Sequence, residues 1–262
     1  MKRIVFCIFT FFIICLMVVS IIKVYRYYAP PKERDVYMLG QHDDTLRIAY
    51  IGDSWAYIHQ RDHQCQIPII IQDQCKMPTK IYSYGFPGRT SKEIYDAIFD
   101  DKEQGQLLQK HGFQYCIVSA GINDANKKMG IKYYQKSMDY IIRFLLSNHV
   151  RPIIIEMPDY DIHKTYRWQK ADRKILYKLS MTINKVPVDC KQIYRDALDE
   201  LILNNGYQEK VSIIRYKSWN NDYEKDQKIL YLIDGIHLNE YGNAVLDSFI
   251  AKEIIRNIGN KF

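Results

Sequence analysis

The stretch RIAYIGDSW, residues 47–55, decides the fold of this chain. Its first five residues form an apolar run of strand length. Gly52, Asp53 and Ser54 follow at once, and Asp and Ser are common first residues of helices. The stretch therefore predicts a strand that leaves its sheet through a tight turn and passes directly into a helix. A serine at such a turn exposes its hydroxyl at the helix N-terminus, where negative charge is favoured.

Four further apolar runs predict strands at 80–84, 114–120, 152–156 and 211–216. Between and after these strands, the spacing of apolar residues predicts helices at 91–99, 133–147, 166–184, 192–203 and 239–258. Strands rich in Ile and Val that alternate with helices predict a parallel sheet covered on both faces. We therefore expect one α/β domain over residues 45–262, a three-layer α/β/α sandwich around five parallel strands. Ligands of such sheets bind beyond the carboxyl ends of the strands.

Polar residues stand in the loops that follow these strands. Ser54 follows the first strand, Gly88 the second and Asn123 the third, while Asp234 and His237 precede the final helix. Taken singly, each has a plain explanation as a helix cap, a turn or a surface pair. Together they supply what an activated serine needs, namely a base, a group that orients the base, and donors for a developing oxyanion. The Asp and His side chains can face each other if their segment is helical.

This set resembles the four sequence blocks of the SGNH, or GDSL-type, hydrolases, and the resemblance extends from about residue 47 to the C-terminus. It implies a flavodoxin-like fold and a serine esterase with Ser54 as nucleophile, His237 as base and Asp234 orienting His237. The Ser54 and Gly88 amides and the Asn123 side chain would form the oxyanion hole. No cofactor and no metal are implied.

One position departs from the family pattern, because Ile58 stands where the first block usually has glycine. Family members act on acetylated sugars, lipids, aryl esters and thioesters, so the resemblance leaves the substrate open. We expect an O-acyl group on a carbohydrate. The residues expected to line its cleft, for which ordinary packing is an equal explanation, are Trp55, Tyr160, Asp161, His163 and Trp168.

Two other functions fit the same residues. An O-acyltransferase would use the same triad with a glycan hydroxyl in place of water, and only the exclusion of water would distinguish it. A catalytically silent, membrane-tethered glycan-binding protein would keep the fold alone. Nucleic-acid binding is disfavoured, because the net charge of +7 is spread along the chain without a dense basic block. The oligomeric state is left open.

The N-terminus predicts a membrane anchor. Residues 4–22 are almost entirely apolar and about long enough to cross a bilayer. No small-x-small cleavage site follows Ser20, so we expect an uncleaved anchor over residues 1–26 and a tether over 27–44, stiffened by Pro30 and Pro31. Basic residues flank both ends of the run. We expect the catalytic domain to be extracytoplasmic, because such anchors are common on exported enzymes.

The six cysteines predict no metal site, since no C-x-x-C pair and no His cluster at zinc spacing occurs. Cys65 and Cys75 could form a disulfide only if the segment between them bends back. On one continuous helix they would lie about 15 Å apart, which is too far.

Overall fold

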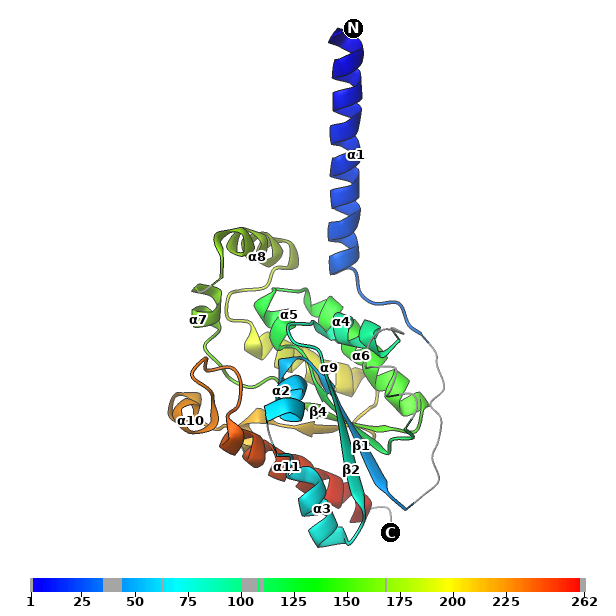
Figure 1. The fold of residues 1–262 in the computed structure, drawn as a ribbon, viewed down its shortest axis with the longest axis vertical. Helices are drawn as coiled ribbons and strands as arrows, with labels where there is room; N and C mark the ends of the chain where they lie inside the picture. The colour runs from blue at the N-terminus through cyan, green and yellow to red at the C-terminus, as the bar shows by residue number, and fades with distance from the viewer. Residues whose placement is uncertain are drawn as a thin grey trace.

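The computed structural model describes residues 2–34, 44–62, 64–99, 108, 111–167 and 169–259. Five parallel strands form one sheet in the order β2-β1-β3-β4-β5 (Figure 1). They are β1 (Leu46–Gly52), β2 (Thr79–Gly85), β3 (Tyr115–Ser119), β4 (Arg151–Ile155) and β5 (Ser212–Ile214). The five predicted strands and their parallel arrangement are confirmed. This is the flavodoxin-like order, whose topological switch point lies between β1 and β3.

Helices cover both faces of the sheet. One layer consists of α4 (Ser91–Ile98), α6 (Ile131–Ser147) and α9 (Lys191–Asn204), which pack in that order. The other contains α3 (Ile67–Cys75) and α11 (Glu240–Gly259), which pack on each other. Between the sheet and these layers lies the core, and the three-layer α/β/α architecture is therefore confirmed.

The central strands show why their sequences are continuously apolar. Every residue of β1 and β3 is buried, because helices cover the sheet on both sides. Ile48, Ile51, Ile117 and Val118 are completely inaccessible to solvent. In α6, by contrast, buried residues recur every three or four positions, since only one side of a helix faces the sheet.

The helices of the carboxyl half differ in part from the prediction. The single helix expected over 166–184 is two helices, α7 (Ile162–Arg167) and α8 (Ala171–Asn184), and Lys170 between them is extended. Spacing alone did not reveal this break. The helix predicted directly after the first strand is α2 (Ser54–Asp62). Three short helices were not predicted, because nine residues or fewer give little periodic signal. They are α3, α5 (Ile122–Asn126) and α10 (Tyr223–Leu230).

The N-terminal helix α1 (Lys2–Tyr28) continues six residues past the predicted end at Ile22. Its segment Ile8–Tyr28 is long and apolar enough to cross a membrane, and none of its most apolar window is buried. The helix projects from the domain (Figure 1).

The described part of the predicted tether lies against the domain. The Arg34 amide donates to the Tyr95 hydroxyl at 2.7 Å, and Lys92 Nζ donates to the carbonyls of Arg26 and Ala29, both at 2.8 Å. Residues 27–34 are thus held on α4 and do not form a free spacer. The rest of the predicted tether, apart from Asp44, lies outside the described residues.

Gly52 is required where β1 passes closest to β3. A Cβ there would lie 2.0 Å from Ser119 Oγ and 2.5 Å from the Ser119 carbonyl oxygen. We predict that Gly52→Ala lowers the free energy of unfolding by about 3 kcal/mol, because a backbone atom of the central strand would have to move. Denaturant unfolding measures this. Gly259→Ala is the matched control, since its Cβ would meet nothing within 4 Å, and equal stability of the two variants would contradict the prediction.

Candidate active site

Ser54 is the first residue of α2 and follows the end of β1 after a single residue. Asp53 lies in the turn and accepts the Trp55 amide at 3.0 Å through Oδ1, as a helix N-cap does. The chain therefore passes from the end of strand β1 into helix α2 through a turn of one residue. The Ser54 side chain, half-buried, stands at the N-terminus of the helix.

A continuous hydrogen-bonded chain joins three of the predicted site residues. Ser54 Oγ lies 2.8 Å from His237 Nε2, and His237 Nδ1 lies 2.6 Å from Asp234 Oδ2. The other carboxylate oxygen of Asp234 accepts the amides of Ile236 and His237 at 2.9 and 3.0 Å. Burial would raise the pKa of Asp234, but these hydrogen bonds outweigh it and lower the pKa to about 2. Asp234 is therefore ionised at neutral pH and holds the ring in one orientation.

The Asp–His segment is a tight loop and not the helical turn that the three-residue spacing suggested. Tyr231 and Leu238 close the loop as an isolated antiparallel bridge, and the Leu232 amide donates to the His237 carbonyl at 2.7 Å. Gly235 has a φ of 69°, a left-handed conformation that favours glycine. Within this loop the two side chains still face each other, so the expected contact forms by a different backbone geometry.

Asn123 lies in α5, directly beyond β3, on the other side of the switch point from Ser54. Its Nδ2 is 3.4 Å from Asp53 Oδ2. An amide nitrogen carries two protons, so one can bond Asp53 while the second remains available to a ligand. Asp53 thereby contacts both sides of the switch point, the helix that begins at Ser54 and the side chain of Asn123.

Gly88 lies in the loop between β2 and α4, is exposed, and has a φ of 76°. Behind it, the amide and hydroxyl of Ser91 donate to the buried carboxylate of Asp124 at 2.8 and 2.6 Å. This contact fixes the start of α4, and with it the loop of Gly88, to α5. The role of the Gly88 amide in an oxyanion hole stays a prediction.

Two carboxyl groups are therefore buried beneath the site. Burial raises the pKa of Asp53 to about 7 and that of Asp124 to about 6, although their hydrogen bonds act in the opposite direction. Sequence reasoning treated both as turn or cap residues and did not assign them a place beneath the site. The available signal was their position, since each is directly adjacent to a predicted site residue at the end of a fully buried strand.

No family model matches this chain, and no curated protein matches it in sequence. Its structure, however, is similar to solved structures of ester hydrolases. An acetyl xylan esterase, AlAXEase, is 17% identical with a TM-score of 0.55, covering 80% of this chain and all of that one (100%). The chain has the SGNH hydrolase fold.

Two further structures support this assignment of the fold. A mutant of Axe2, an acetyl-xylooligosaccharide esterase from Geobacillus Stearmophilus, is 14% identical with a TM-score of 0.55, over 80% of this chain and 94% of that one. A lipase/acylhydrolase from Enterococcus faecalis is 17% identical with a TM-score of 0.52, over 80% and 95%. At these identities the likeness concerns the fold of the SGNH domain.

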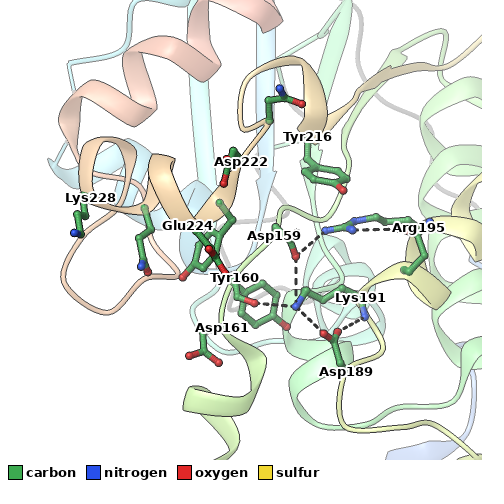
Figure 2. Close-up of a pocket in the computed structure, with 14 residues that line it drawn as sticks. Asp159, Tyr160, Asp161, Asp189, Lys191, Arg195, Tyr216, Asp222, Glu224 and Lys228 are labelled. Atoms are coloured by element: carbon green, nitrogen blue, oxygen red, sulfur yellow. Dashed lines mark hydrogen bonds and ion pairs between the residues drawn. The ribbon is translucent and has the colours of Figure 1, made fainter.

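A groove of about 1130 Å³ is lined by the segments 159–161, 189–195 and 216–228 (Figure 2). Its wall is joined to the triad loop, because the Tyr223 hydroxyl donates to the Gly235 carbonyl at 2.7 Å. In its floor, Lys191 Nζ lies 3.4 Å from Asp159 and 3.1 Å from Asp189. The lining is rich in acidic and aromatic side chains, among them Asp159, Tyr160, Asp161, Asp189, Tyr216, Asp222, Tyr223 and Glu224.

The five residues expected to contact substrate take different positions. Tyr160 and Asp161 line the groove. Trp55 is only 5% exposed and packs edge-on against Trp219, whereas His163 is exposed on α7. Trp168 lies outside the described residues. Contact of any of these side chains with a substrate stays a prediction.

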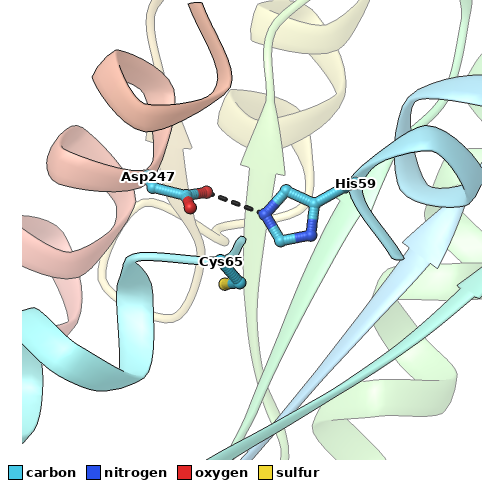
Figure 3. A group of neighbouring side chains, drawn as sticks. All are labelled: His59, Cys65 and Asp247. Carbon is cyan, nitrogen blue, oxygen red and sulfur yellow. Dashed lines mark hydrogen bonds and ion pairs between the residues drawn. The ribbon is translucent and has the colours of Figure 1, made fainter. Parts of the chain in front are cut away.

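His59, Cys65 and Asp247 form a cluster whose potential metal ligands lie within 4.8 Å of one another (Figure 3). The sequence spacing predicted no such group, because its members come from α2, the loop before α3, and α11. Their hydrogen bonds give them a structural role. Asp247 accepts from the Gln66 amide at 2.7 Å and lies 2.8 Å from His59 Nε2. Burial also holds the pKa of the Cys65 thiol well above its ordinary value, so the cluster ties α2 to α11 without a charged thiolate.

Disulfides do not contribute to the described part of the chain. Cys65 and Cys75 are both free thiols.

The buried carboxyl group of Asp53 predicts a specific pH dependence of stability. Its pKa rises from 3.8 to about 7 on folding, so between pH 4 and 7 the unfolded chain loses this proton while the folded chain keeps it. The stability contributed by protonated Asp53 is therefore complete below pH 4 and is lost as the pH rises through 7. We predict that the wild type loses about 2–4 kcal/mol over this range relative to Asp53→Asn. Urea unfolding of both proteins at pH 4, 6 and 8 measures the difference, and a difference independent of pH would contradict the prediction.

Proposed function

We propose that this chain is a serine esterase of the SGNH type that forms an acyl-enzyme on Ser54. The supporting observation is the hydrogen-bonded chain from Ser54 through His237 to Asp234, with 2.8 and 2.6 Å between successive polar atoms. A serine hydroxyl becomes nucleophilic only when such a base accepts its proton. In the described residues, an imidazole held by an ionised carboxylate and pointing at a helix-terminal serine serves this chemistry best.

Hydrolysis would proceed in two halves. In the first, Ser54 Oγ attacks the ester carbonyl carbon and its proton passes to His237 Nε2. The carbonyl oxygen becomes an oxyanion that receives the free N–H of Asn123 and the amides of Ser54 and Gly88. The intermediate expels the alcohol, which takes the proton from His237. In the second half, a water molecule attacks the acyl-enzyme with His237 again accepting the proton, and the carboxylic acid leaves as Ser54 regains its hydrogen.

We further propose that the ester is an O-acyl group on a carbohydrate. The groove joined to the loop of Asp234 and His237 offers carboxylates that can accept hydrogen bonds from sugar hydroxyls, and aromatic rings on which a sugar can pack. Two of the similar structures are described as esterases of acetylated xylan or xylooligosaccharide. Tyr160, Asp161 and Tyr223 are the side chains we expect to contact the sugar, because they line the groove and Tyr223 joins it to the loop of Asp234 and His237.

We propose that α1 anchors the enzyme in a membrane, with residues 1–26 as the anchor, 27–44 as the connection and 45–262 as the catalytic domain outside the cytoplasm. The length and composition of α1 and the exposure of its most apolar window support this assignment. An apolar helix exposed on all sides requires an apolar environment.

The proposed nucleophile makes a direct prediction. Ser54→Ala should lower kcat on acetylated xylooligosaccharides by about 10⁴–10⁶-fold, because the variant lacks the proposed nucleophile. Acetate release measures this, and a fluorophosphonate probe should label the wild type but not the variant. Ser218→Ala, at an exposed hydroxyl, is the matched control. Equal labelling of wild type and Ser54→Ala would disprove the esterase mechanism and favour a silent glycan-binding protein.

The oxyanion hole makes a second prediction. Asn123→Ala should reduce kcat by about 10²–10³-fold with little change in KM, since the lost hydrogen bond forms chiefly in the transition state. The control is Asn205→Ala, because Asn205 lies at the C-terminal end of α9, at the opposite edge of the sheet. Full activity of Asn123→Ala would remove this side chain from the proposed hole.

A further inference from the structure

Helix α8 carries an apolar stripe on its outer side. The opposite side is held to the domain, where Ser180 is 1% exposed and Asn184 Nδ2 donates to the Lys128 carbonyl at 2.8 Å. The stripe follows a helical spacing of i, i+1, i+4 and i+8, which places its members on one side of the helix. The members and their exposed fractions are Ile175 69%, Leu176 55%, Leu179 54% and Ile183 59%.

The stripe lies where α1 meets the domain. The hydroxyls of Tyr28, at the end of α1, and Ser180, in α8, are hydrogen-bonded. Figure 1 shows α8 on the side of the domain from which α1 projects. The six residues from Lys23 to Tyr28 extend the helix by about 9 Å beyond the predicted apolar run. The polar layer on each side of a bilayer is about 5–8 Å thick, so α8 would lie level with the headgroups.

The charges around the stripe complement an anionic membrane surface. Residues 170–185 contain one acidic residue, Asp172 in the first turn, and five basic residues, which are Lys170, Arg173, Lys174, Lys178 and Lys185. Apolar residues on one side with lysines and arginines around them are typical of helices that lie in the membrane interface. Basic residues near the surface also gain from anionic headgroups.

We propose that the stripe of α8 inserts into the headgroup region of the membrane that α1 anchors, and so forms a second contact between the enzyme and the bilayer. The proposal rests on α1 being a membrane anchor. It also concerns the groove, because α8 lies in the chain between the two groove-lining segments 159–161 and 189–195. A membrane-bound α8 would therefore fix the orientation of the groove relative to the bilayer.

The test uses the full chain in vesicles of phosphatidylcholine and phosphatidylglycerol whose acyl chains carry bromine, a quencher of tryptophan fluorescence. Leu179→Trp places a reporter in the stripe. Ile229→Trp is the matched control, because Ile229 is 56% exposed, close to the 54% of Leu179, and lies on α10, far from α1 (Figure 1). We expect bromolipid to quench the added emission at 179 at least about twofold more than that at 229. Unchanged activity on a soluble ester verifies that both variants fold.

Other outcomes would overturn the proposal. If aqueous acrylamide quenches the tryptophan emission at 179 as strongly as that at 229, and bromolipid does not quench it, the stripe faces water. Shielding of 179 from both quenchers would show that a second copy of the chain covers it. Retention of the protein in carbonate-washed vesicles separates these failures from failure of the anchor, because loss from the vesicles would disprove the role of α1 and with it that of α8.

Discussion

A single hydrogen bond between the Ser54 hydroxyl and His237 Nε2 joins the start of the domain to the loop before its last helix, and the site depends on it. The two residues are 183 positions apart, so their separation is set by the tertiary structure that holds α2 and the loop before α11 together. The buried cluster of His59 and Asp247 connects these same helices at 2.8 Å. This cluster therefore holds α2, which begins at Ser54, in register with α11, which follows the loop of His237.

Two buried carboxyl groups hold the segments of Asn123 and Gly88 in a similar way. Asp53 connects the N-terminus of α2 to Asn123, and Asp124 connects the start of α4 to α5. Burying a carboxylate is unfavourable unless it accepts hydrogen bonds, and each of these accepts at least two. The raised pKa values of both groups show that the compensation is incomplete. Burial of these two carboxyl groups therefore lowers the stability of the protein, while their hydrogen bonds fix the positions of α2, α4 and α5 at the carboxyl edge of the sheet.

The sequence predicted the sheet and the positions of Ser54 and Asn123 for one reason. Strands buried on both faces need continuous runs of Ile and Val, and the polar residue directly after such a run must lie at the carboxyl edge. Contacts between distant segments left no such pattern. His59 and Asp247 are 188 residues apart, and the loop of Asp234 is shaped by the pairing of Tyr231 with Leu238. The groove likewise draws on several separate segments of the chain. The break between α7 and α8 was missed because periodicity continues on both sides of it.

The contacts of residues 27–34 with α4 limit the movement of the domain relative to α1. A domain on a flexible linker would move over a wide range of positions and would meet substrates at many distances from its attachment point. With the contacts of Tyr28, Arg34 and Lys92, the proposed anchor would hold this domain at a nearly constant height above the bilayer. The proposed enzyme would then meet substrates only within a thin layer, so its effective substrate concentration would be counted per unit area and not per unit volume.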